Sequence, residues 1–137
     1  MTSEQRHGRE FDLVIYGATG FVGKLLSDYL ARFAPSGMKI ALAGRSQSKL
    51  VALRETLPSP ASSWPIIVAD ADDEDALDSL AGRTKVVVTT VGPYLKYGLP
   101  LVNACAKKGT HYADLTGEAL FVRRCIDECD ELAKQSG

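Results

Sequence analysis

Three regularly spaced glycines are the first feature of this sequence that could do chemistry. Gly17, Gly20 and Gly23 lie in the segment GATGFVG, between the apolar run FDLVIY and an amphipathic stretch. Glycine weakens a strand or helix interior by roughly 0.5–1 kcal/mol relative to alanine. Three glycines at one junction therefore indicate a backbone that another molecule approaches closely. A strand, a glycine-rich turn and a helix in this order are typical of a dinucleotide site, where the helix N-terminus binds a pyrophosphate.

The spacing G-x-x-G-x-x-G differs from the usual G-x-G-x-x-G fingerprint but meets the same physical needs. Gly17 would allow the tight turn, Gly20 would let the backbone touch the pyrophosphate, and Gly23 would let the helix pack closely on the sheet. The alternative is a purely structural turn, because glycines also mark ordinary turns. The residues expected to contact the coenzyme here are Gly17, Ala18, Thr19, Gly20, Phe21, Val22 and Gly23.

The second β-prone run, KIALAG, is followed by residues that select the coenzyme. An NAD site usually has Asp or Glu about 20 residues after the glycines, where it binds the ribose 2′-OH. No acidic residue lies between Met38 and Arg54. Instead Arg45 can pair with a 2′-phosphate and stack on adenine, with help from Ser46 and Lys49. We expect a preference for NADP(H) over NAD(H); the alternative is a solvated Arg45 beside a helix-capping Ser46.

Two later strand ends are expected to complete the cleft. Asp70 and Ala71 follow the apolar run IIVA, where a carboxylate can accept a hydrogen bond from the adenine amino group. Asp70 is equally well explained as a loop residue or a helix cap. Val91, Gly92 and Pro93 end the run KVVVTTV, and Gly92 would let the nicotinamide side of the coenzyme pass over the backbone. A plain Gly-Pro turn is the alternative there.

Five further polar or aromatic residues have a structural and a functional interpretation. Asp114, Thr116 and Glu118, in the segment HYADLTGE, lie where they could face a substrate or the nicotinamide. Capping of the last helix, with Glu118 in its first turn, is the favoured interpretation. Tyr94 and Tyr97, in GPYLKYG, could line the mouth of the pocket, but packing against the next helix is favoured.

No catalytic residue and no metal site can be assigned from the sequence. Cys105, Cys125 and Cys129 are an odd number of thiols and fit no disulfide framework. The last two lie four apart on an apolar helical stripe, which indicates buried thiols rather than metal ligands. No tyrosine is followed four residues later by lysine, the pair that short-chain reductases use, so a proton donor is not evident.

The elements that must position these residues alternate along the chain. Each β-prone run is followed by a segment with helical periodicity, and the last helix is expected over residues 118–135. Strands that are apolar on both sides indicate a parallel sheet covered by helices on both faces. We therefore expect an α/β, doubly wound Rossmann fold with strand order 3-2-1-4-5. The expected strands span residues 11–16, 39–44, 66–70, 85–91 and 111–115.

Size and charge are consistent with one globular unit. The chain has 137 residues and a formal net charge of -1, so nucleic-acid and anionic-membrane binding are disfavoured. Residues 1–10 are polar and are expected to form a flexible tail before a domain over residues 11–137. The chain stops where a sixth strand would follow, so we expect the front piece of a longer protein; a natural five-stranded domain is the alternative. The expected location is the cytoplasm, and an open sheet edge would permit a homodimer.

Four strings resemble a known family. The chain resembles the N-terminal part of saccharopine dehydrogenase-like oxidoreductases, in the branch of trans-acting enoyl reductases. The resemblance is carried by the segments GATGFVG, AGRS, GPYLKYG and DLTGE. One departure is Ala119, directly after Glu118, where the family often has proline. The resemblance extends from Phe11 to Gly137.

This resemblance implies a longer NADP(H)-dependent enzyme, of which this chain is the coenzyme-binding part, inactive alone. It further implies that the longer enzyme reduces a carbon–carbon double bond in an acyl or polyketide-type lipid substrate. The expected location is the cytoplasm, and the alternative is that the full-length protein binds peripherally to a membrane. The alternative is a non-catalytic module that senses NADP(H) or binds a partner. The residues themselves do not identify the substrate.

Overall fold

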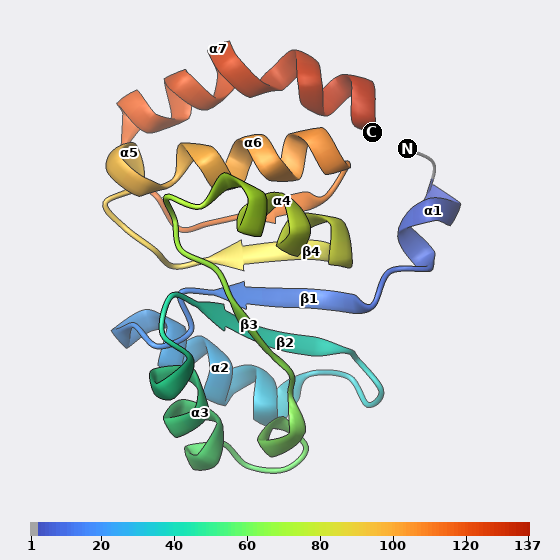
Figure 1. Ribbon diagram of the computed structural model, residues 1–137, viewed down its shortest axis with the longest axis vertical. Coiled ribbons are helices and arrows are strands. Elements are labelled where there is room, and N and C mark those ends of the chain that lie inside the picture. The colour runs from blue at the N-terminus through green and yellow to red at the C-terminus, as the bar shows by residue number, and fades with distance from the viewer. Residues whose placement is uncertain (1–2) are drawn as a thin grey trace.

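A five-stranded, all-parallel sheet forms the centre of the computed structural model, which describes residues 3–137. Its spatial order is β3-β2-β1-β4-β5 (Figure 1), which confirms the predicted strand order. β1 lies in the middle, with Tyr16 paired to Ala43 on one side and to Thr89 on the other. The carboxyl ends of the strands therefore meet at one edge of the sheet. The strands are β1 (Phe11–Tyr16), β2 (Ile40–Gly44), β3 (Ile66–Val68), β4 (Thr84–Thr89) and β5 (His111–Ala113).

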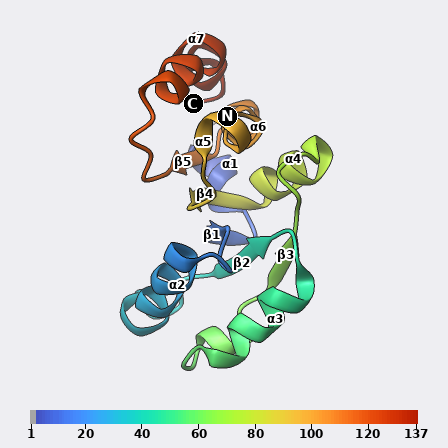
Figure 2. The ribbon, with the colours of Figure 1, turned by 90° about the vertical axis from the view of Figure 1, so that its left-hand side faces the viewer.

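Helices cover both faces of this sheet (Figure 2). α2 (Phe21–Phe33) and α3 (Gln47–Thr56) pack on one face, and α4 (Glu74–Arg83) and α6 (Leu99–Lys108) pack on the other. α7 (Ala119–Ser136) lies on the outer side of α6 (Figure 1). The short elements α1 (Ser3–His7), η1 (Ala61–Ser63) and α5 (Tyr94–Tyr97) were not predicted.

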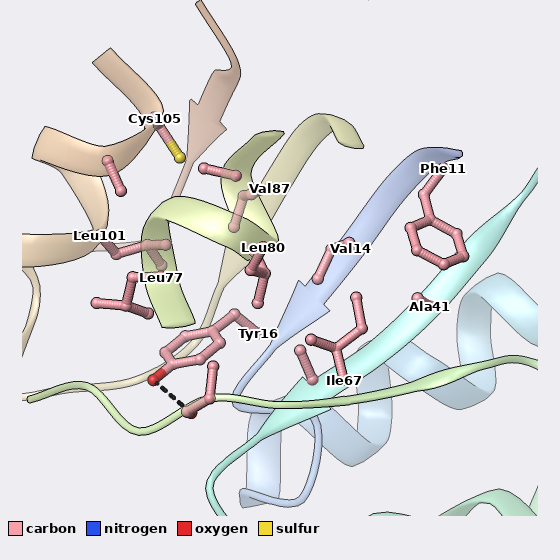
Figure 3. Close-up of a cluster of buried hydrophobic side chains, with 14 residues drawn as sticks. Phe11, Val14, Tyr16, Ala41, Ile67, Leu77, Leu80, Val87, Leu101 and Cys105 are labelled. Carbon is pink, nitrogen blue, oxygen red and sulfur yellow. Dashed lines mark hydrogen bonds between the residues drawn. The ribbon is translucent and has the colours of Figure 1, made fainter. Parts of the chain in front are cut away.

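Alternate residues of β1 supply two separate cores, because successive side chains of a strand point to opposite faces. Val14 and Tyr16 pack with α4 and α6, whereas Leu13 and Ile15 pack with α3. Figure 3 shows the first of these cores, in which the Tyr16 hydroxyl donates to the Ala69 carbonyl at 3.2 Å. Burial, aided by the negative charge of Asp70, raises the pKa of Tyr16 to about 12. The phenol therefore stays protonated and keeps this donor role at neutral pH.

Local signals in the sequence set several helix ends. Asp73 caps α4 by accepting from the Ala76 amide at 3.0 Å, and Ser46 caps α3. Pro100 occupies the first turn of α6, and Gly109, at φ 62°, ends that helix in the left-handed conformation that glycine favours.

Three strands end two residues earlier than expected. β3, β4 and β5 stop at Val68, Thr89 and Ala113, whereas the expected strands continue to Asp70, Val91 and Leu115. The residues that follow leave the ladder and enter loops at the carboxyl edge of the sheet. Residue type alone does not reveal this, because an apolar side chain suits both a strand and a packed loop.

The segment expected to be a flexible tail differs in the structure. Met1 and Thr2 lie outside the described residues, but α1 follows them and Arg9 attaches the segment to the base of the sheet. The Arg9 guanidinium donates to the Thr84 carbonyl at 2.6 Å and also to the Lys108 carbonyl near the end of α6. A guanidinium fork satisfies carbonyls that a helix end leaves without partners. Arg9 and its partners lie far apart in the sequence, so the spacing of residues near Arg9 could not predict these bonds.

Several large apolar residues of α2 lie on its exposed side, while the residues that are fully buried are small. Gly23, Ser27 and Ala31 are buried against the sheet, while Phe21 and Phe33 are 82% and 66% exposed. Small residues let this helix approach the sheet closely, so its large apolar residues cannot all reach the core. α7 behaves similarly, since Phe121 and Cys129 are buried whereas the apolar side chains of Val122 and Ile126 are exposed.

An ion pair between Asp12 and Lys85 makes stability depend on pH. The Asp12 carboxylate accepts from Lys85 Nζ at 2.6 Å and from the Lys39 amide at 2.8 Å. These two bonds, with that from Lys85 the larger, lower the pKa of Asp12 below its usual 3.8. A lowered folded-state pKa contributes stability that is present above pH 3.8 and is lost as the pH falls through the folded-state value.

We therefore expect Asp12→Asn to lower the free energy of unfolding by about 1 kcal/mol at neutral pH. The difference from the wild type should shrink steadily as the pH falls below the usual aspartate range. Urea unfolding at a series of pH values measures both. A deficit of constant size at every pH would show that the charge of Asp12 contributes nothing.

Candidate dinucleotide site

A cleft of about 460 Å³ opens at the carboxyl edge of the sheet, where β1, β2, β3 and β4 end. This is where ligands bind in open α/β sheets. The predicted site residues that line it are Gly17, Thr19, Gly20, Arg45, Asp70, Ala71, Val91 and Gly92. The sequence interpretation did not assign Tyr16, Gly44, Asp72 or Thr90 to the cleft, although they line it as well, and it favoured packing for Tyr97, which also lines it.

Two of the three glycines are required by the packing of the protein itself. Gly17 has φ +81°, and a Cβ there would lie 2.5 Å from Val91 Cγ2. A Cβ on Gly23 would lie 2.1 Å from the Gly17 carbonyl oxygen and 2.8 Å from backbone atoms of Ala18. Gly17 thus allows the turn, and Gly23 allows α2 to start directly against it. Both roles match the expectation from the sequence.

Gly20 differs, because nothing in the fold requires a glycine there. Its φ is −71°, and a Cβ would meet only the Gly17 carbonyl oxygen, at an ordinary 3.5 Å. Gly20 is the N-cap of α2, and no side chain caps the helix at that residue. The first N–H groups of a helix need acceptors and carry partial positive charge. An uncapped helix end beside a dispensable glycine fits a bound diphosphate.

The other residues of the turn do not face the cleft with their side chains. Ala18 is fully buried in the core, and the side chains of Phe21 and Val22 are 82% and 41% exposed on the outer surface. Neither Phe21 nor Val22 lines the cleft. Any contact that these two residues make with a diphosphate would therefore come from their backbone amides.

Arg45 lies exposed at the end of β2 and lines the cleft. Within residues 3–137, no carboxylate forms an ion pair with it. Ser46 accepts a long hydrogen bond from the Lys49 amide, at 3.5 Å, and so caps α3, as the alternative interpretation of this residue predicts. Its hydroxyl also lies 3.2 Å from the Ser48 hydroxyl, with which it forms a second hydrogen bond. Lys49 and Lys24 line a neighbouring groove that shares Thr19 with the cleft, so positive charge gathers on this side.

The Asp70 carboxylate forms part of the cleft wall and also shapes its loop. It accepts from the Asp72 amide at 3.2 Å, while the helix cap is supplied by Asp73 instead. Asp70 is therefore a loop residue whose side chain also reaches the cleft, and the two interpretations are compatible. Asp72 lies beside it, on the same loop.

The two tyrosines after Pro93 have different roles. Tyr94 is buried, donates to the Thr89 carbonyl at 3.2 Å, and packs on Phe121 with ring centroids 5.6 Å apart. This confirms the packing interpretation for Tyr94. Tyr97 instead lines the cleft, which corrects that interpretation. Pro93 itself is exposed and lies outside the cleft lining.

The DLTGE segment is structural, but it does not cap α7 as expected. Asp114 accepts from the Tyr112 hydroxyl at 2.7 Å and from the Thr116 amide at 2.9 Å, and Thr116 Oγ1 accepts from the Glu118 amide at 3.0 Å. The Glu118 carboxylate turns away from α7 and accepts from the amides of Tyr94 and Leu95. These bonds join two loops, which spacing along the chain does not reveal.

The thiols are not activated. Burial raises the pKa of Cys105 to about 12 and that of Cys125 to about 11, so both stay protonated at neutral pH. In the described part of the chain, no three His, Cys, Asp or Glu side chains gather as a metal site would require. The same part contains no helix with the length and apolar character needed to cross a membrane.

Known sequences resemble this chain over almost its whole length. The family model described as "Saccharopine dehydrogenase NADP binding domain" matches residues 13–137. A protein of Mycobacterium tuberculosis strain H37Rv, provisionally named a trans-acting enoyl reductase, is 57% identical over 129 residues. The trans-acting enoyl reductase of Mycobacterium leprae strain TN is 55% identical over 129 residues. Each alignment covers 94% of this chain, but only 30% and 31% of the two relatives.

A solved structure shows the same fold. The apo saccharopine dehydrogenase (L-Glu forming) of Saccharomyces cerevisiae superposes with a TM-score of 0.69 at 21% sequence identity. The match covers 84% of this chain and 24% of the yeast protein. The family description also supports the expected coenzyme, NADP(H), in place of NAD(H).

Proposed function

The chain belongs to the saccharopine dehydrogenase NADP-binding domain family, and we propose that its cleft holds NADP(H) for an oxidoreductase that reduces a carbon–carbon double bond. One observation carries this proposal: the uncapped, glycine-lined start of α2 and the exposed Arg45 lie on the same cleft. The first suits a diphosphate and the second suits a 2′-phosphate.

Each part of the coenzyme has a proposed set of partners. The diphosphate would be bound by the backbone amides from Gly20 to Val22, with the Thr19 hydroxyl beside them. Arg45 would bind the 2′-phosphate from the cleft, and Ser46, the next residue, and Lys49, which lines the neighbouring groove, are proposed to assist it. Asp70 and Ala71 would contact the adenine, and the nicotinamide half would lie along Val91 and Gly92.

When bound, NADPH supplies a hydride. This chain's own residues would bind and orient the coenzyme, and Tyr16, which lines the cleft wall, donates through its hydroxyl to the Ala69 carbonyl. The relatives that are 55–57% identical carry the name trans-acting enoyl reductase, which supports an unsaturated acyl or polyketide-type substrate for the whole protein. This chain spans about 30% of their length, so the substrate site and proton donor are proposed to lie outside the cleft described here.

Calorimetric titration of the chain with NADPH and with NADH tests the proposal. We expect NADPH to bind with a Kd in the micromolar range, on the order of −8 kcal/mol, and at least about tenfold more tightly than NADH. Equal affinity for the two coenzymes would contradict the role of Arg45. No binding of either coenzyme would contradict the proposed function.

A further inference from the structure

We propose that Glu118 is a positioning residue for the nicotinamide half of the coenzyme, acting through the segment from Gly92 to Tyr97. The assignment rests on the function proposed above. Glu118 is not among the residues that line the cleft, so we assign it no direct contact with the coenzyme. Its role follows from what its carboxylate holds in place.

The carboxylate of Glu118 joins two parts of the chain that are far apart in sequence. It accepts from the Tyr94 amide at 2.6 Å and from the Leu95 amide at 3.2 Å, residues that precede it by 24 and 23 positions. Pro93, just before them, has no N–H to donate. Hydrogen bonds to an ionised acceptor are roughly twice as strong as neutral ones. Glu118 thus accepts from the first two amides of α5, in addition to the bond from the Tyr94 hydroxyl to the Thr89 carbonyl.

Glu118 is itself fixed by a chain of hydrogen bonds from β5. Its amide donates to Thr116 Oγ1, the Thr116 amide donates to Asp114, and Asp114 also accepts from the Tyr112 hydroxyl. Burial, followed by the bond to Asp114, raises the pKa of Tyr112 above its usual range. The phenol therefore remains a donor, and the loop that carries Glu118 is connected to the sheet.

An aromatic contact supports the same arrangement. Phe121, in the first turn of α7, packs against the Tyr94 ring, and Gly98 leaves room for it. A Cβ on Gly98 would lie 2.8 Å from two atoms of the Phe121 ring. The start of α7 thus contacts both ends of α5. Glu118 bonds to the first two amides of α5, and the Phe121 ring packs beside Gly98, which follows its last residue.

The segment held in this way forms one wall of the cleft. Gly92 and Tyr97 both line it, and the Lys96 ammonium lies 4.9 Å from the centre of the Tyr97 ring. Arg45 lines the cleft from the end of β2, two strands away from β4 in the sheet. Loosening the Gly92–Tyr97 wall should therefore weaken contacts to the nicotinamide half and leave the adenosine half in place.

Two ligands separate these halves. NADPH contains both, whereas 2′,5′-ADP contains only the adenosine half with its 2′-phosphate. For Glu118→Ala we expect NADPH binding to weaken about tenfold and 2′,5′-ADP binding to stay within about twofold. Glu118→Gln should fall between the wild type and Glu118→Ala, because an amide oxygen still accepts but carries no charge. The blue fluorescence of bound NADPH reports the nicotinamide directly.

Glu128→Gln is the matched control, because Glu128 lies exposed on the same helix and pairs only with Arg124 in the described structure. If Glu118→Ala does not fold, Thr116→Val is the second variant, because it removes the oxygen that accepts from the Glu118 amide. It should weaken NADPH binding by a smaller factor than Glu118→Ala and leave 2′,5′-ADP binding unchanged. Equal weakening of both ligands would overturn the proposal, because Glu118 would then support the fold in general. Unchanged binding of both would also overturn it. A wild type that binds neither ligand would instead refute the proposed function.

Discussion

A Gly23→Ala variant is expected to lose NADPH binding by about 100-fold or more, and to unfold more easily by about 3 kcal/mol. The new Cβ would lie 2.1 Å from the Gly17 carbonyl oxygen and 2.8 Å from two backbone atoms of Ala18. Backbone atoms have no alternative rotamer, so α2 would have to move away from the turn. The amides proposed to bind the diphosphate would move with it.

Gly82→Ala is the matched control for this variant. Gly82 lies within α4, and the nearest atom to its new Cβ would be Lys108 Cδ at 4.0 Å. Alanine is the better helix former by about 0.8–1 kcal/mol, so this variant should bind NADPH normally and be slightly more stable. Calorimetry and urea unfolding measure the two effects. A Gly23→Ala protein with wild-type affinity would show that the close contact between α2 and the turn is not needed.

The second large effect is expected for Arg45→Ala, which should weaken NADPH binding by about 100-fold while changing NADH binding by less than about threefold. A 2′-phosphate carries close to two negative charges, and no carboxylate among the described residues pairs with Arg45. The guanidinium is therefore available to the phosphate. Arg45→Lys should recover part of the loss, because lysine keeps the charge but not the bidentate geometry.

Arg32→Ala removes the same charge at an exposed site and serves as the control. Arg32 pairs with Asp28 on the outer side of α2, at 2.9 Å. Its replacement should leave the ratio of NADPH to NADH affinities unchanged. Salt should weaken NADPH binding to the wild type more than to Arg45→Ala, because one charge pair is screened in the first case only. If Arg45→Ala keeps the wild-type ratio, the 2′-phosphate is bound elsewhere.

Only the tertiary structure decided which side chains meet across the loops. Tyr97 faces the cleft and Tyr94 the core, although both lie in the same four-residue helix. Glu118 bonds to amides in another loop instead of its own helix, and Arg9 anchors a segment that composition predicts to be loose. Each of these contacts joins residues distant in the chain, and no local spacing encodes such a pairing.

The sequence by itself determined the order of strands, the glycine turn and the positive residue after the second strand. These features depend on short-range physics. Strand and helix periods appear within a few residues, and right-handed crossovers leave few ways to arrange five parallel strands. Because β1 and β2 are neighbours in that arrangement, the turn at Gly17 and the side chain of Arg45 had to reach the same edge. The Gly92–Tyr97 wall of the cleft could be recognised only in the folded chain. Its position depends on the bonds from Glu118 and on the packing between α7 and α5.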